Sequence, residues 1–94
     1  MVDTLSSKEV EEQLAHLDNW SVVDGKLKRV FKFDDFVRAF AFMAAAAIEA
    51  EKMNHHPEWA NVYNKVTVNL ITHEAKGITE RDFGLAKKLD ALAR

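Results

Sequence analysis

The sequence predicts an α+β fold in which three helices pack on one face of a four-stranded antiparallel sheet. Three observations indicate it: two segments alternate like hairpin strands, a long helical pattern separates them, and helix-start signals occur near both ends of the chain. A hairpin holds its two strands antiparallel, and the helices are expected to cover the apolar face that both hairpins present. The 94 residues suffice for one domain, predicted over residues 1–94.

The first helix is predicted from about Ser7 to Leu17. Ser6 and Glu9 have the spacing of a capping box, in which each side chain bonds to the backbone of the other residue. Apolar residues then recur on one helical face: Val10, Leu14 and Leu17.

A first hairpin is predicted between Trp20 and Phe33. Asp24-Gly25 indicates a two-residue type I′ turn, because both positions of that turn need a positive φ. Closing this loop sets Val22 opposite Leu27 and places every second residue on the same face. We expect that face to meet the core: Trp20, Val22, Leu27, Phe31 and Phe33.

A long helix is predicted over residues 35–53, and Asp34 is placed to cap its start. Its alanines permit close approach to a sheet. Two adjacent apolar rows follow from the helical period: Phe36, Phe40, Met43 and Ala47 in one, and Val37, Ala44 and Ile48 in the other.

The second hairpin is predicted between Trp59 and His73, a stretch rich in strand-forming residues. A single strand of that length would be unusual, so a turn is predicted at Asn64-Lys65. The strand after this turn alternates as a half-buried strand does, with Val66, Val68 and Leu70 on one side.

The last helix is predicted to begin after Gly77. Thr79 and Asp82 have capping-box spacing at its start. An inward stripe then follows at helical spacing: Phe83, Ala86, Leu89 and Leu92. The open sheet leaves two edge strands, which favours pairing between subunits.

Composition excludes several classes of function. Thirteen Lys and Arg against fifteen Asp and Glu give a net charge of -2, which argues against nucleic acid as a partner. The chain has no cysteine, so it has no disulfide, thiolate zinc site or cysteine nucleophile. The start shows no secretory signal, and the longest apolar stretch, residues 39–48, is too short to span a membrane. We therefore expect a cytoplasmic protein that does not contact membranes.

Three of the four histidines lie where predicted elements end: His55 and His56 after the long helix, and His73 after the last strand. Histidine is suited to proton transfer near neutral pH. Any one of them could equally be a solvated loop residue, as His16 on the first helix is expected to be. No metal site is predicted, because a zinc site needs three or four convergent ligands and the adjacent pair lacks the one-face spacing of helical metal motifs.

The spacing of these residues resembles a family signature. The pattern is Glu51, three residues, His55-His56-Pro57, five residues, Tyr63, nine residues, His73, eight residues and Asp82. It is similar to the signature of the pterin-4a-carbinolamine dehydratases, and a looser similarity extends over most of the chain. One departure is Asn54, which stands where many members of the family have aspartate.

This resemblance implies the same sheet-and-helix fold, a homodimer or homotetramer, and a hydro-lyase activity. The family dehydrates 4a-hydroxytetrahydrobiopterin to quinonoid dihydropterin and so recycles the cofactor of aromatic amino acid hydroxylases. The resemblance implies no metal and no organic cofactor, and a functional link to such a hydroxylase.

The resemblance also implies roles for the residues that match the signature. His55 and His73 are assigned to proton transfer, without deciding which is acid and which is base. His56 is expected to bind substrate and to serve as a third proton carrier. Asp82 either caps the last helix or orients a histidine, and the family signature favours orientation.

Further positions are expected to bind or support the substrate. Thr72 and Glu74 flank His73 and can present hydrogen-bonding groups to a pterin edge, and Asn54 is grouped with them. Glu51 can pair with His55 if the helix persists, or lie on a solvated face. Pro57 and Trp59 are expected to have supporting roles. The side chains of Trp59 and Tyr63 can stack on a flat ring or pack in the sheet, and packing is favoured for Tyr63.

Two other functions remain open at this stage. One is a non-catalytic binding module, because animal members of the family also stabilise dimers of a homeodomain transcription factor. The other keeps the pterin site but serves another pathway, such as molybdopterin metabolism.

Overall fold

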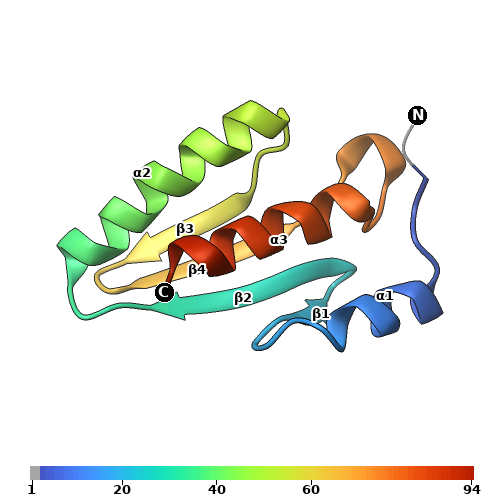
Figure 1. The fold of residues 1–94 in the computed structure, drawn as a ribbon, viewed down its shortest axis with the longest axis horizontal. Coiled ribbons are helices and arrows are strands. Elements are labelled where there is room, and N and C mark those ends of the chain that lie inside the picture. The colour runs from blue at the N-terminus through green and yellow to red at the C-terminus, as the bar shows by residue number, and fades with distance from the viewer. Residues whose placement is uncertain (1–2) are drawn as a thin grey trace.

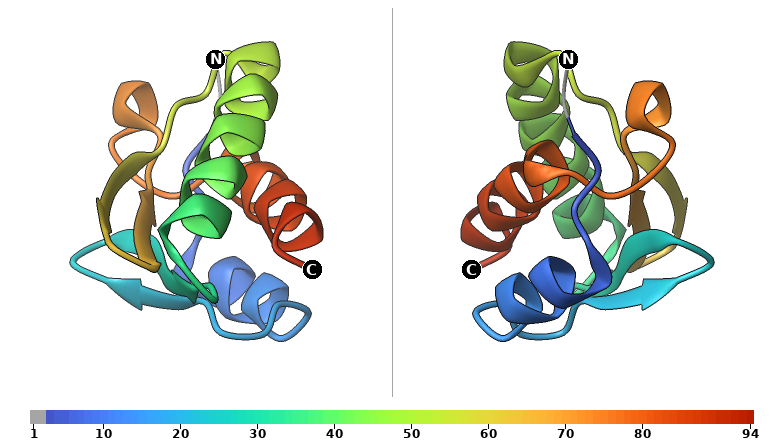
Figure 2. Two further views of the ribbon diagram at one scale, coloured as in Figure 1. Left: turned by 90° about the vertical axis from the view of Figure 1, so that its left-hand side faces the viewer. Right: turned by 90° about the vertical axis from the view of Figure 1, so that its right-hand side faces the viewer.

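The computed structural model describes residues 3–94 and has the predicted α+β architecture (Figure 1). Four antiparallel strands lie in the order β1-β2-β4-β3, and the helices lie on one side of the sheet (Figure 2). Along the chain the elements are α1 (Ser7–Leu14), β1 (Ser21–Val23), β2 (Lys26–Lys32), α2 (Phe36–Met53), β3 (Glu58–Val62), β4 (Lys65–Leu70), the 3-10 helix η1 (His73–Ala75) and α3 (Glu80–Leu92).

The first hairpin has the predicted register. Val22 pairs with Leu27 across a loop in which Asp24 and Gly25 have φ values of 53° and 75°, as a type I′ turn requires. Trp20, Leu27 and Phe31 are buried, which confirms most of the predicted inner face. Val22 departs from it and is 45% exposed, since β1 is a three-residue edge strand at the margin of the core.

The second hairpin turns one residue earlier than predicted. Val62 pairs with Lys65, so the two-residue loop is Tyr63-Asn64 rather than Asn64-Lys65. The side-chain amide of Asn61 donates to the carbonyls of Tyr63 and Lys65 and so fastens this loop. Tyr63 has a φ of 52° and is 61% exposed at the tip, so the predicted packing of its ring is wrong. The predicted inner row of β4 is confirmed, with Val66, Val68 and Leu70 buried.

Helix α1 begins as predicted but ends early. Its capping box is present, with Ser6 and Glu9 bonded reciprocally. The helix stops at Leu14 rather than Leu17, because the amides of His16 and Leu17 donate to the carbonyls three residues before them and no longer four.

Helix α2 has the predicted length but presents a different face to the core. Its N-cap is Asp35, whose carboxylate accepts the amide of Arg38, and not Asp34. The predicted apolar rows are mostly outside, with Phe36 and Phe40 at 50% and 58% exposed. A row of mainly small residues packs inward instead: Ala39, Phe42, Ala46 and Ala50. A helix that is apolar on all sides leaves this choice to packing, and the alanine row allows the closest approach.

Helix α3 starts at the predicted capping box of Thr79 and Asp82. It packs against α2, and its inward side is buried as predicted except for the partly exposed Leu92. Within residues 3–94, no helix combines the length and apolar character needed to cross a bilayer.

Candidate active site

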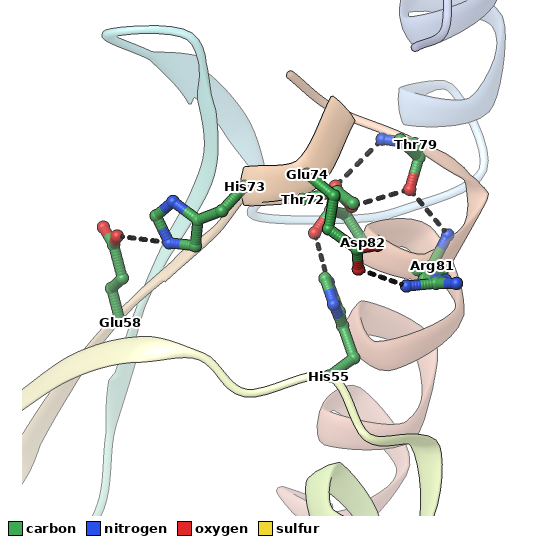
Figure 3. A network of polar contacts seen from close by, with 8 residues as sticks. All are labelled: His55, Glu58, Thr72, His73, Glu74, Thr79, Arg81 and Asp82. Carbon is green, nitrogen blue, oxygen red and sulfur yellow. Dashed lines mark hydrogen bonds and ion pairs between the residues drawn. The ribbon is translucent and has the colours of Figure 1, made fainter. Parts of the chain in front are cut away.

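The predicted histidines gather at one end of the sheet. There the C-terminal end of α2, the start of β3, the end of β4 and the N-terminal end of α3 come together (Figure 3). His55 leaves α2, His73 leaves β4, and Asp82 belongs to the first turn of α3. Segments far apart in the sequence therefore build one site.

The end of α2 directs His55 inward. Asn54 has a left-handed conformation with φ 50° and ψ 44°, which asparagine tolerates at a helix end, and the His55 amide bonds back to the Ala50 carbonyl. This turn buries the His55 ring, whose Nε2 lies 2.6 Å from Asp82 Oδ1. An ionised carboxylate only accepts hydrogen bonds, so Nε2 carries the hydrogen and a neutral ring then has Nδ1 as its acceptor.

Asp82 makes the contacts that both of the roles considered for it require. While Oδ1 bonds His55, Oδ2 accepts the Thr79 amide at 2.9 Å and thereby completes the capping box of α3. The same Oδ2 accepts the Thr72 hydroxyl at 2.9 Å, and the hydroxyls of Thr72 and Thr79 lie 2.7 Å apart. All of these side chains are buried, so the helix start and the orientation of His55 depend on one carboxylate.

Glu51 lies on a solvated face, which was one of the two alternatives considered for it, and its partner there is His56 rather than His55. Glu51 Oε1 lies 2.7 Å from His56 Nε2, and both side chains are largely exposed. The alternative, a pair with His55, required the helix to persist through His55. The left-handed Asn54 ends the helix instead and turns His55 toward α3, so His56 falls beside Glu51.

His73 is held from the other side of the site. Its Nε2 lies 3.0 Å from Glu58 Oε2, and its ring points to Glu58 rather than to Asp82 (Figure 3). The other oxygen of Glu58 accepts the ammonium of Lys26, which reaches across from β2. The hydrogen bond from Lys26 is the main cause that lowers the pKa of Glu58 below its ordinary value of 4.5, and His73 adds to the shift.

The three histidines nevertheless line one cavity. It has a volume of about 170 Å³ and is lined by Asn54, His55, His56, Ile71, Thr72, His73 and Glu74. Larger cavities lie elsewhere, one of about 600 Å³ with mainly apolar walls between α1 and β1, but its lining contains no histidine. The chemistry therefore favours the smaller cavity, whose lining side chains are polar except for Ile71.

The remaining predicted residues take different positions around it. The Thr72 hydroxyl is buried and hydrogen-bonded to Asp82 and Thr79. Glu74 is exposed, and its carboxylate accepts a hydrogen bond from Arg81 at 2.9 Å. Trp59 is half-buried and packs against the core from β3, and Pro57 is half-buried before it. Among residues 3–94 no group of three or more candidate ligands has the arrangement of a metal site.

Sequence reasoning assigned no role to Glu58, Lys26 or Arg81. Glu58 directly follows His-His-Pro, and that adjacency was the available signal. No sequence signal pointed to Lys26, because its contact with Glu58 depends on the pairing of β2 with β4 and of β4 with β3. Arg81 likewise reaches Glu74 only because α3 begins beside η1.

Comparison with known proteins points in one direction. A family model described as pterin 4 alpha carbinolamine dehydratase matches residues 3–92. A protein of Solibacter usitatus, provisionally named a pterin-4-alpha-carbinolamine dehydratase, is 57% identical over 93 residues, 99% of this chain and 98% of that protein. One of Brucella ovis with the same provisional name is 52% identical over 91 residues, covering 95% of this chain and 94% of its own.

A solved structure agrees with these sequence matches. The crystal structure of a protein described as a transcriptional coactivator/pterin dehydratase, from Brucella melitensis, superposes with a TM-score of 0.95 at 50% identity. The match covers 98% of this chain and 100% of the other.

Proposed function

The chain belongs to the pterin-4a-carbinolamine dehydratase family of hydro-lyases, and from that premise we propose that it dehydrates 4a-hydroxytetrahydrobiopterin to quinonoid dihydropterin and water. The observation that carries the proposal is one cavity lined by three histidines, each with its Nε2 no more than 3.0 Å from a carboxylate oxygen. We further propose that residues 1–94 act as one catalytic domain.

The reaction needs one acid and one base. The 4a oxygen must be protonated as its bond to carbon breaks, and the N5 hydrogen must be removed to complete the imine. We assign these two proton transfers to His55 and His73, which approach the cavity from α2 and from the end of β4. With Nε2 committed to a carboxylate, Nδ1 is the nitrogen that each neutral ring has free to accept a proton.

The other residues support these transfers. Asp82 holds His55, and Thr72 holds Asp82 through its buried hydroxyl. His56, beside Glu51, is an exposed substrate contact and a third proton carrier.

Asn54 and Glu74 line the cavity and present polar groups to the pterin ring. Pro57 and Trp59 are supporting residues that fix the start of β3 next to the histidines. Neither a metal nor an organic cofactor enters the proposed reaction.

The surface of α2 supports a homodimer or homotetramer. Four large apolar side chains are at least half exposed along this helix: Phe36, Val37, Phe40 and Ile48. Contiguous exposed apolar residues of this kind favour association, and β3 adds an open sheet edge. A hydroxylase-linked recycling role and a cytoplasmic location stay predictions from the sequence.

The second candidate is a non-catalytic binding module. It is favoured by the same α2 surface and by the description of the Brucella melitensis protein as both coactivator and dehydratase. A role of the pterin site in another pathway, such as molybdopterin metabolism, would keep the cavity but change the substrate.

The deciding experiment follows the decay of 4a-hydroxytetrahydrobiopterin produced by a phenylalanine hydroxylase. We expect the purified protein to accelerate that decay and His55→Ala or His73→Ala to remove most of the acceleration. His16→Ala, at an exposed histidine outside the cavity, is the matched control and should behave as wild type. A wild-type protein without effect on the decay would instead favour the binding module.

A further inference from the structure

The two carboxylate oxygens of Glu58 contact residues from two different elements. From the first position of β3, one oxygen accepts the Lys26 ammonium of β2, and the other meets His73 Nε2 at 3.0 Å beyond the end of β4. The strands lie in the order β2-β4-β3, so this chain of contacts spans three neighbouring strands. Because both oxygens have partners, the carboxylate cannot turn without breaking a charged contact.

From this geometry we propose that Glu58, oriented by Lys26 in a two-residue relay, fixes the tautomer of His73. The Lys26 ammonium has donors only, and an ionised carboxylate has acceptors only. The carboxylate therefore requires a hydrogen on His73 Nε2, and the Lys26 contact determines which of its oxygens faces the ring. Glu58 is a positioning residue that acts through His73, and its catalytic consequence rests on the proposed dehydratase function.

The surroundings of His73 leave Glu58 as its direct partner. Glu74, the next residue, is engaged by Arg81 of α3 at 2.9 Å. His55 and His56 share the cavity, but Asp82 and Glu51 respectively bond their Nε2 atoms. The charged and titratable groups around His73 are thus of three kinds. Glu58 contacts the ring, His55, His56 and Glu74 share its cavity, and Lys26 and Arg81 bond Glu58 and Glu74.

The relay predicts an unusual effect of an amide at position 58. In Glu58→Gln, Lys26 still requires an oxygen, so the amide oxygen turns to Lys26 and its NH₂ group meets His73 Nε2. That nitrogen then has to accept, and the ring shifts toward the Nδ1–H tautomer. Removing the ammonium in the double variant Lys26→Met/Glu58→Gln frees the amide to turn its oxygen to His73, so the original tautomer should return.

The test reads the ring directly, without substrate. The ¹⁵N shifts of the two ring nitrogens of His73, measured on the free protein above the pH where the ring titrates, report the tautomer. We expect Nε2–H in wild type and in Lys26→Met, a shift toward Nδ1–H in Glu58→Gln, and reversal in the double variant. Glu49→Gln is the matched control, since Glu49 is also bonded by a lysine, Lys88, but lies outside the cavity.

Activity supplies the second readout. For a solvent-exposed pair we expect Glu58→Gln to lower kcat about two- to fivefold with little change in KM, Glu58→Asp to recover part of the loss, and the double variant to exceed Glu58→Gln. A tautomer that is the same in wild type, Glu58→Gln and the double variant would overturn the relay. If the shifts follow the relay but wild type has no dehydratase activity, the proposed function fails and the relay stands.

Discussion

The two histidines assigned to proton transfer stand in opposite surroundings. His55 and Asp82 are 8% and 0% exposed at their side chains, and Thr72 and Thr79 close the group from behind. His73 and Glu58 are 70% and 40% exposed, with Lys26 as the third member. The buried group is part of the start of α3, so a substitution in it affects the proton-transfer chemistry and the stability of the fold together. In the exposed group they are separable, because water replaces any partner that is lost.

The sharpest contrast is expected when each ring is removed. His55→Ala and His73→Ala should both lower kcat, by about 10²- to 10⁴-fold for loss of one acid or base. Only His55→Ala should also lower the free energy of unfolding clearly, because it leaves Asp82 Oδ1 buried without its partner. Urea unfolding followed by tryptophan fluorescence, with turnover measured on the same samples, checks this. Equal loss of stability in both variants would contradict the comparison.

Removing the carboxylate of the buried group should cost the most stability. Asp82→Ala deletes the partner of His55 and the acceptor of the Thr79 amide together, so we expect a loss of about 3–5 kcal/mol in the free energy of unfolding. Asp18→Ala, at an exposed carboxylate outside the cavity, should change stability by less than about 0.5 kcal/mol. A mild effect of Asp82→Ala would mean that α3 does not depend on this cap.

A smaller effect is expected one contact further away. Thr72→Val keeps the shape of the side chain but removes the hydroxyl that bonds Asp82 and Thr79, which should cost about 1–3 kcal/mol. Thr67→Val, on the outer face of β4, is the matched control. If His55 depends on this support, kcat should fall in Thr72→Val and not in Thr67→Val.

The smallest effect is expected on the pH dependence of stability, in variants of two partly exposed carboxylates. Bonding by lysine lowers the pKa of Glu58, through Lys26, and of Glu49, through Lys88, below 4.5. A lowered pKa in the folded state stabilises the fold above the unfolded value, and that contribution disappears as the pH falls through the folded value. Glu58→Gln and Glu49→Gln should therefore be slightly less stable than wild type at pH 7 and equal to it well below pH 4. Urea midpoints at the two pH values measure this.

Local signals predicted the fold and the capping carboxylate correctly because each needs only neighbouring residues. The capping boxes at Ser6 and Thr79 and the turn at Asp24-Gly25 act over two to four positions, and all three are present. The face of α2 was not predictable in this way. With apolar residues around the whole helix, the period identifies a helix but does not choose between the alanine row and the phenylalanine row.

The carboxylate partners of the histidines were not predictable from local signals either. Glu51 stands four residues before His55, which suggests a helical pair, yet the left-handed Asn54 gives Glu51 to His56 and His55 to Asp82. Glu58 and Lys26 are 32 residues apart and meet only through strand pairing. Sequence spacing says little about such contacts, because the path of the chain between them sets the distance.

The order of the elements, their caps and turns, and the histidines at the end of the sheet could be read from the amino-acid sequence. Those features depend on backbone preferences and hydrophobic periods that act within a few residues. Which carboxylate contacts each ring, how deeply each pair is buried, and which side of α2 stays exposed became known only from the folded chain. These are set by the packing of helices against the sheet and by strand register, where groups distant in the chain compete for the same space and the same hydrogen bonds.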